Sequence, residues 1–454
     1  MKFSVFKITL FFLMFAANAS AQDGFSSEVM ARGFFASGEN NPFWMYSNQK
    51  GRIDQQTDVN GLVASAYLWE INENSSLKFK GGLAYKNGLY DDDFYVDELF
   101  ASYRWKTIYA HLGVRHRDTH FQGISSVGGD VLWSNNARAL PGLELGLSEP
   151  FKIFKWFYAQ PKIAHYELND TRFQEGAQVH FKSLYLDLRF SPKDILSGEL
   201  KHYVQWGGFN PRNDTPGNQL PEGFTDFIKV FFGSRGGENA TNSDQVNVLG
   251  NHIGSYELKY RRLGETMTIT AYHQSIFEDQ SGRELNNFPD GVWGILLEPK
   301  NNKLLSGIIL EYVQTVSQSG RFISRDGSTG SFSGSDNYFI GNTYDSGWTY
   351  QDRIIGLPFI FKEEDGYPFT NSRSYVYHLG ATGQISKLNY KLKLSYVENL
   401  GTYGRPIDEK AVYSFADLVY PTSYGDFLIS VGADLGNGVR EDTFGGSLGY
   451  RYNF

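Results

Sequence analysis

The chain has 454 residues, no cysteine, 49 glycines and a large aromatic content of 36 Phe, 29 Tyr and 8 Trp. Its mean hydropathy is −0.39 and it has no apolar run of about 18 residues beyond the N-terminus, which excludes a protein that crosses a membrane with several helices. The absence of cysteine excludes disulfide scaffolds, and a net charge of −8 without a basic cluster argues against a nucleic acid partner. We therefore expect a folded, all-β chain without a cofactor or a bound metal.

The N-terminus has the pattern of an export signal. Lys2 and Lys7 flank an apolar run at 8–17, and Ala19-Ser20-Ala21 supplies the small residues of a cleavage site before Gln22. The alternative is a single-span anchor, but the run is too short for about 30 Å of hydrocarbon. We predict a cleaved signal peptide at 1–21 and a single mature domain at 22–454.

The C-terminal segment alternates between apolar and polar residues with a period of two. In 444–454, the even-numbered positions hold glycine or apolar residues and the odd-numbered positions hold small or polar ones. We call each set of alternate positions a parity, and the chain ends in Phe454. A soluble edge strand can also alternate, but a terminal Phe preceded by Tyr450 and Tyr452 is typical of the closing strand of an outer-membrane barrel. The same period recurs at 77–86, 184–190 and 388–396, so we expect apolar side chains to face lipid and polar ones to face a lumen.

Connection lengths support a transmembrane antiparallel β-barrel. Read backwards from the C-terminus, connections alternate between short turns and longer loops, of which about 207–251 and 316–373 are the longest. With the short turns in the periplasm, both termini are also periplasmic and the long loops are extracellular. We predict about eighteen strands, with sixteen as the alternative count, at 27–37, 61–70, 76–85, 94–105, 107–115, 139–147, 155–167, 178–190, 197–206, 252–261, 265–275, 291–298, 305–315, 374–385, 388–397, 411–420, 426–435 and 444–454.

The polar parity of these strands is rich in charge. One interpretation is a ladder of ion pairs that fills a wet lumen, and the other is a basic field that attracts an anionic ligand. The basic positions are Lys78, Lys80, Arg104, Arg115, Arg189, Lys201, Lys259, Arg261, Lys391, Lys393 and Arg451, and the acidic ones are Glu98, Asp187, Glu199, Glu257 and Glu311.

Candidate ligand residues gather where strands meet the long loops. Trp206 ends a strand, and Gly207 and Gly208 after it allow positive φ angles and close backbone approach. Indole rings and amides suit a sugar, which presents apolar C–H faces and hydroxyls, although a rim tryptophan can also be a membrane girdle residue. The other candidates are Trp348, Tyr350, Gln351 and Arg353 in the second long loop, and Trp133, Asn135, Asn136 and Arg138.

Several short motifs resemble the capsule assembly protein Wzi family. The resemblance implies an eighteen-stranded outer-membrane barrel that binds capsular polysaccharide at the surface of a Gram-negative cell as a lectin. Better-known members carry a periplasmic helical bundle near the N-terminus, whereas 26–37 here has a strand pattern and 52–60 is short and polar. The motifs are His202 to Gly208 (HYVQWGG), Asn251-His252-Ile253-Gly254-Ser255-Tyr256, Tyr344-Asp345-Ser346-Gly347-Trp348, Gly356-Leu357-Pro358, Asn41-Pro42-Phe43-Trp44 and Asn48-Gln49-Lys50-Gly51.

Two other functions were weighed. An outer-membrane hydrolase would need a Ser/His pair with an orienting acid, and no acid can be assigned to His252 with Ser255 or His273 with Ser275, so we do not expect an enzyme. A general porin or solute transporter is the stronger alternative. A porin requires a water-filled path through the barrel, whereas a lectin does not require one. In either case we expect a monomer in contact with outer-membrane lipid.

Overall fold

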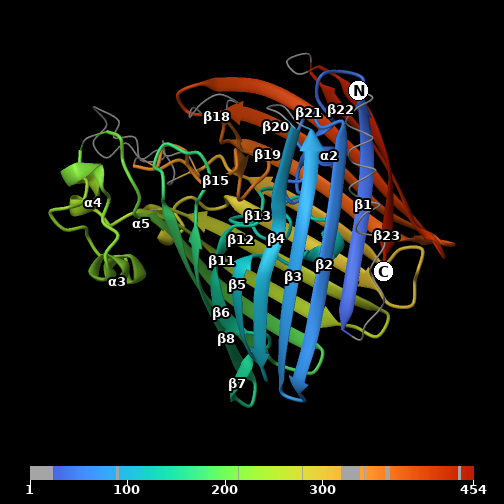
Figure 1. Ribbon diagram of the computed structural model, residues 1–454, viewed down its shortest axis with the longest axis horizontal. Helices are drawn as coiled ribbons and strands as arrows, with labels where there is room; N and C mark the ends of the chain where they lie inside the picture. Colours follow the sequence, from blue (N-terminus) through green and yellow to red (C-terminus); the bar gives the residue numbers. More distant parts are fainter. Residues whose placement is uncertain are drawn as a thin grey trace.

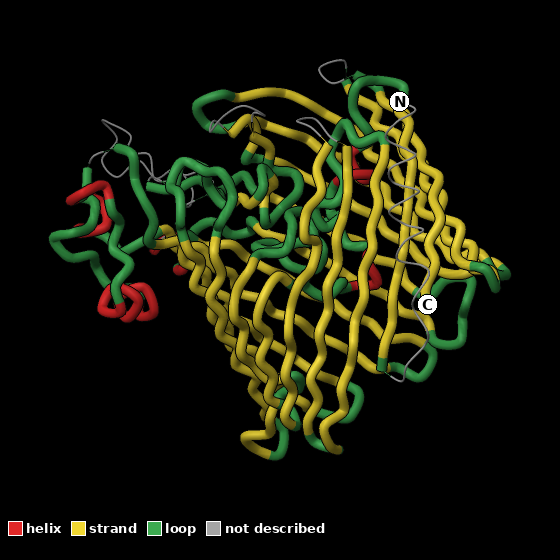
Figure 2. The backbone as a smooth tube through the Cα atoms, viewed as in Figure 1, coloured by secondary structure: helices red, strands yellow, loops and turns green. Residues whose placement is uncertain are grey.

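The computed structural model describes residues 24–87, 92–212, 214–278, 280–318, 338–341, 343–362, 369–437 and 441–454. The predicted signal peptide and parts of the second long loop lie outside this range. Within it, one large antiparallel sheet closes into a barrel (Figures 1 and 2). The strands of the wall are β1 (Phe25–Ala36), β2 (Val59–Asn72), β3 (Ser75–Asn87), β4 (Asp92–Trp105), β5 (Ile108–Val114), β6 (Pro141–Leu147), β7 (Phe151–Phe154), β8 (Phe157–Glu167), β9 (Gln178–Arg189), β10 (Asp194–Trp206), β11 (Asn251–Leu263), β12 (Met267–Phe277), β13 (Gly291–Pro299), β14 (Gly307–Gln314), β19 (Ser374–Ile385), β20 (Leu388–Gly401), β21 (Pro406–Thr422), β22 (Gly425–Gly436) and β23 (Thr443–Asn453).

The barrel has eighteen strand positions. The sheet contains nineteen strands, but β7 is a four-residue piece that pairs with β8 beyond the end of β6, so the two share one position. Each strand pairs with the next along the chain, and β1 closes the barrel on β23, where Val29 lies opposite Tyr452. The prediction of an eighteen-stranded antiparallel barrel is therefore confirmed.

The two ends of the barrel differ in their connections. Turns of a few residues, such as 73–74 and 386–387, join strands at one end, and the long segments 37–58, 115–140, 207–250 and 315–373 join them at the other. The start of β1 and the end of β23 both lie at the short-turn end, because β1 begins opposite the last part of β2. Residues 25–36 form a strand, as their pattern predicts.

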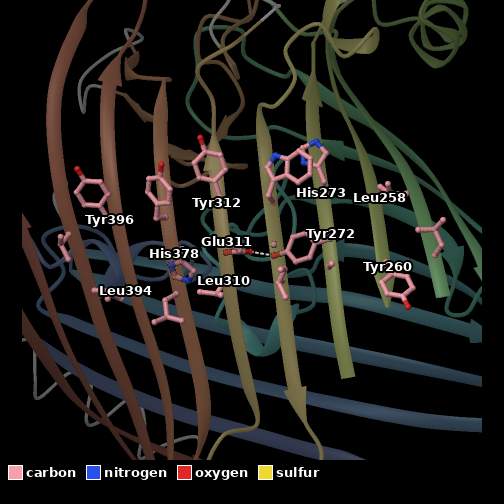
Figure 3. Close-up of a pocket in the computed structure, with 18 residues that line it drawn as sticks. Leu258, Tyr260, Tyr272, His273, Leu310, Glu311, Tyr312, His378, Leu394 and Tyr396 are labelled. Atoms are coloured by element: carbon pink, nitrogen blue, oxygen red, sulfur yellow. Dashed lines mark hydrogen bonds between the residues drawn. The ribbon is translucent and has the colours of Figure 1, made fainter. Parts of the chain in front are cut away.

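The outward face of the wall is apolar. A broad hollow of about 840 Å³ on this face is lined by leucine and aromatic side chains of neighbouring strands (Figure 3). His273, Trp293, Tyr312, Tyr377 and Tyr396 form a cross-strand row over β12, β13, β14, β19 and β20. Exposed apolar side chains on a closed antiparallel ladder fit contact with lipid.

The inward face carries the charged residues. Lys80 pairs with Glu98, Lys259 with Glu257 and Arg189 with Asp187. The charges on the lumen side therefore neutralise each other, but only the pair of Lys80 with Glu98 joins two strands. The predicted ladder that fills a wet lumen is not what these three pairs form, because two of them lie within one strand.

Helices are short and lie between strands. In the described part of the chain, no helix is both long enough and apolar enough to cross a membrane. The helices are α2 (Phe43–Tyr46), α3 (Phe224–Phe232), α4 (Asn242–Val246) and α5 (Gln280–Arg283), with 3-10 turns at Phe121–Gly123 and Pro216–Asn218; the small loop strands are β15 (Thr349–Tyr350), β16 (Arg353–Ile354), β17 (Phe361–Lys362) and β18 (Phe369–Asn371).

Candidate functional site

Three long connections turn inward and fill the lumen. Residues 40–53, 121–140 and 338–361 contribute most of the large buried apolar side chains of the protein, together with inward side chains of the wall. We call these three segments the plug. The hydrophobic core of this molecule therefore lies inside the barrel, and it is built mainly from loops.

Trp348 is the centre of one half of the plug. Its side chain is 0% exposed, and its indole N–H donates to the carbonyl oxygen of Leu132 at 2.6 Å. Its ring packs edge-on against Trp133 at 6.3 Å between centroids and lies 5.3 Å from the ring of Tyr203 on the wall. Ser134 Oγ donates to the carbonyl oxygen of Gly356 at 2.7 Å, which ties the same two loops together again.

The first loop forms the other half of the plug. Phe43 stacks on Tyr413 of β21 at 4.4 Å and on Phe359 of the second long loop at 5.4 Å. Trp44 is fully buried, and its indole N–H donates to Ser395 Oγ of β20 at 3.2 Å. The helix α2 that carries both rings is only one turn long, so tertiary packing holds it in place.

Inward polar residues of the wall anchor the plug. Glu311 accepts hydrogen bonds from Ser125 Oγ at 2.7 Å, from the Ser126 amide at 2.6 Å and from Tyr272 Oη. The Tyr272 ring lies across Gly294, where a Cβ would come within 2.1 Å of the ring, so this position requires glycine (Figure 3). These hydrogen bonds to a buried carboxylate tie the segment 121–140 to the wall.

A second anchor is an ion pair between the plug and β10. Lys201 Nζ lies 3.0 Å from Asp130 Oδ2, and Asp130 also accepts from the Leu132 amide at 2.9 Å. Burial favours the neutral carboxyl, yet the charges of Lys201 and Arg117 outweigh it and lower the pKa of Asp130. Arg117 itself lies over the Trp133 ring at 4.0 Å. The buried side of the plug therefore combines aromatic packing with compensated charge.

The structure brings together four of the sequence-predicted ligand residues at the long-loop end. We call Arg138, Tyr350, Gln351 and Arg353 the mouth cluster. Both arginines are in ion pairs: Arg138 with Asp93 at 2.5 Å and Arg353 with Asp54 at 3.2 Å. Tyr350 Oη donates a hydrogen bond to Asn169 Oδ1 at 2.7 Å. The backbone N–H of Gln351 donates to Asp170 Oδ2 at 2.8 Å. Arg138, Gln351 and Arg353 keep part of their surface accessible, whereas Tyr350 is buried.

The other predicted residues lie elsewhere. Trp133 and Trp348 are buried within the plug, and Trp206 is 3% exposed on the outward side of the wall, where it packs against Phe227 of α3. Asn136 holds two loops together through the carbonyl oxygen of Ile354, and Asn135 borders the lumen.

Gly207 and Gly208 adopt the positive φ angles that the sequence suggested, 67° and 90°. Their close approach is to protein, since a Cβ on Gly208 would lie 2.7 Å from the carbonyl oxygen of Glu175. In this arrangement the two glycines serve a tight contact between neighbouring loops.

A polar cavity of about 430 Å³ lies beneath the plug, on the short-turn side. It is lined by wall residues including Arg32, Lys391 and Arg451 and by Lys50 of the first loop. Asp417 and Asp426 balance two of these charges, at 3.3 Å from Arg32 and 2.7 Å from Arg451.

The patterns in the sequence did not predict that the loops fill the lumen. The apolar run Ile354-Ile355-Gly356-Leu357 and the group Phe43-Trp44-Met45 are buried although they lie outside the wall strands. Their signal was available, because apolar runs in otherwise polar loops are unfavourable in water.

An antiparallel barrel with an apolar outer wall, a charged inner wall and loops folded into its lumen defines an outer-membrane β-barrel with a plug of loops in its interior. Residues 39–367 match the capsule assembly protein Wzi family, and the chain belongs to that family. Family and fold place the protein in the outer membrane of a Gram-negative bacterium and in capsule assembly, in a family that is not enzymatic.

Solved outer-membrane proteins are similar in fold only. OccK5 (OpdH) of Pseudomonas aeruginosa has 10% identity and a TM-score of 0.45, covering 96% of this chain and 99% of that one. OccAB4 of Acinetobacter baumannii has 10% identity and a TM-score of 0.47, with 96% and 100% covered. A loop deletion mutant of OmpT of Vibrio cholerae has 9% identity and a TM-score of 0.39, with 95% and 98% covered. The comparison with curated proteins gives no match.

Proposed function

We propose that the protein binds exported capsular polysaccharide at the cell surface and holds it there through the polar surface around the mouth cluster. The observation that carries this proposal is the closed lumen: the long loops are packed into the barrel, and their polar side chains remain at the long-loop end. A surface that is fixed from below by a packed core is preorganised for binding a polymer.

In this proposal the long-loop end faces outside, and the start of β1 and the end of β23, which lie at the short-turn end, face the periplasm. The chain works as a monomer, since β1 pairs with β23 of the same chain and leaves no open edge. Residues 1–21 act as the cleaved signal peptide and 22–454 as one domain.

The predicted ligand residues take two roles. Arg138, Gln351 and Arg353 are partly accessible, and we assign them to direct contact with the sugar chain. Trp133, Trp348 and Tyr350 are covered by protein, so they position the loops that carry these groups. Trp206, Gly207 and Gly208 hold the adjacent loop 207–250.

The test uses a double variant, Arg138→Ala with Gln351→Ala, in cells that make their own capsule. Each lost contact is worth on the order of 1 kcal/mol, and many weak sites act on one polymer, so the capsule retained on washed cells should fall several-fold. The control is Lys193→Ala with Glu265→Ala, an exposed ion pair at the short-turn end. Unchanged capsule retention at equal outer-membrane abundance overturns the proposal.

The alternative is a solute pore. The apolar core that the plug forms inside the barrel favours binding at the mouth over passage of a hydrated solute, although a polar cavity lies beneath the plug.

A further inference from the structure

The connection between β10 and β11, residues 207–250, lies against the outside of the barrel wall. Val204 and Trp206 share the outward parity of Leu200, which is exposed, yet both are buried. They are covered by side chains of the connection, among them Phe227 and Val230 of α3. Figure 1 shows α3 and α4 beyond the wall, beside the long-loop ends of the strands.

The opposite side of α3 is apolar and uncovered. Phe224, Ile228 and Phe232 are spaced by four residues and therefore share one side of the helix, and the first and last are 80% and 73% exposed. Val246 of α4 is exposed as well. Such a helix is unfavourable in water but suits the boundary between lipid headgroups and acyl chains, and it stands next to the apolar wall that already faces lipid.

A cavity of about 710 Å³ separates this connection from the wall and from α5. Its cationic residues are Lys182 on an outward wall position, Arg235 after α3, and Arg283 at the end of α5. His202 and His252 of the wall also line it and hydrogen-bond each other at 3.0 Å. A lysine on the outward parity of a membrane barrel is costly unless polar groups accompany it, and Lys182 Nζ donates to the carbonyl oxygen of Phe231.

The acidic residues of the cavity do not neutralise the arginines. Arg235 and Arg283 have no ion pair with any residue that the structure describes. Glu278 accepts a hydrogen bond from the Phe339 amide of the plug at 2.6 Å. Burial raises the pKa of Asp244, in α4, to about 6, and Asp244 forms no ion pair with either arginine among the described residues.

We propose that this cavity binds the phosphate headgroup of an outer-leaflet lipid through Arg235, Arg283 and Lys182, with Phe224, Ile228 and Phe232 buried in the same leaflet. Guanidinium groups bind phosphate with charge-assisted hydrogen bonds, and the apolar side of α3 places the site at headgroup depth. The inference rests on the orientation in the proposed function, in which the long loops face outside. The bound lipid would fix the connection 207–250 next to the mouth.

The test titrates the purified full chain, in a non-ionic detergent, with dioleoyl phosphatidic acid and counts bound lipid by native mass spectrometry. Arg235→Gln with Arg283→Gln should weaken binding about tenfold, because two charge-assisted contacts are lost. Phe224→Ser with Phe232→Ser, which changes only exposed side chains, should weaken it as well. Lys106→Gln with Lys193→Gln, at short turns, is the charge-matched control and should bind like the parent.

Equal binding by the double arginine variant and the parent overturns the proposal. So does equal binding of phosphatidylcholine, which indicates unspecific lipid contact, or full competition by millimolar inorganic phosphate, which indicates a site for the free anion. Capsule retention in cells separates this inference from the proposed function: the arginine variants should retain the capsule, and the mouth variants should retain lipid binding.

Discussion

Asp54 joins the first loop, the second long loop and the wall. It pairs with Arg353 at 3.2 Å and with Lys86 of β3, and all three side chains are largely buried. Burial favours the neutral carboxyl, but the charges of Arg353 and Lys86 outweigh it and hold the pKa of Asp54 below its usual value. A carboxylate with a lowered pKa in the folded state stabilises the fold above its unfolded pKa, and this contribution is lost as the pH falls through the folded pKa.

We predict that Asp54→Asn lowers the free energy of unfolding by roughly 1–3 kcal/mol at pH 7, because it leaves two cations without their partner. The difference in melting temperature between parent and variant should narrow as the pH falls from 7 to 3, below the ordinary carboxyl pKa and toward the lowered pKa of Asp54. Asp352→Asn is the control, since Asp352 is exposed and its ion pair with Lys362 should contribute little. A difference in melting temperature that is constant from pH 7 to pH 3 would show that the charge of Asp54 does not stabilise the loops.

Residue types alone could not show that the two tryptophans assigned to a sugar are buried on opposite sides of the wall. Trp206 and Trp348 are both nearly fully buried, one against α3 outside the wall and one within the plug. For Trp206 the sequence indicates the side of the wall, because alternate residues of a strand share a face. Trp206 lies two residues after Val204 and four after His202, which are on the outward face. Trp348 has no such marker, because its burial depends on the contact with Leu132, 216 residues away.

The elements of the wall could be predicted because each strand repeats every two residues. Every predicted strand overlaps an observed one, and the differences are at ends, as for 139–147, which is observed as Pro141–Leu147. The plug could not be predicted in the same way. Its residues adopt short, irregular structure that is stable only once the barrel has closed around it, and irregular structure has no period.

Residues 116–139 offer a direct test of the plug as an element. Val114 and Pro141 lie opposite each other on β5 and β6, so an Asn-Gly turn can replace the whole inward segment without changing the strand register. We predict that the parent gives no steady large conductance in a planar bilayer, and that the shortened variant conducts, because it lacks Trp133 and the anchors on Glu311.

Heat-modifiable migration on electrophoresis should show that the shortened variant still forms a barrel. A large steady conductance of the parent would contradict a closed lumen and favour the solute pore. If neither protein conducts, the remaining two loops close the barrel without this segment.

At the scale of the whole molecule, closure depends on the last strand. The Tyr452 and Phe454 rings pack at 4.7 Å, and the Phe454 amide donates to the carbonyl oxygen of Ser27 at 2.9 Å. Deleting 452–454 should expose the edge of β1 and reduce the amount of assembled protein in outer-membrane fractions. Tyr424→Ser, an exposed ring on a short turn, is the control. Normal amounts of heat-modifiable protein after the deletion would contradict a requirement for the closing residues.

Orientation is the property on which both the mouth proposal and the lipid proposal depend, and epitope insertions can measure it. Gly217 lies in the connection 207–250, and a Cβ there would meet nothing within 4 Å, so an insertion should not disturb the fold. The turn at 386–387 is its counterpart at the other end. We predict that antibody labels an epitope at Gly217 on intact cells and one at 386–387 only after permeabilisation, because long loops of outer-membrane barrels are extracellular. The reverse pattern would place the mouth cluster and the lipid cavity in the periplasm, where neither exported capsule nor an outer-leaflet lipid could reach them.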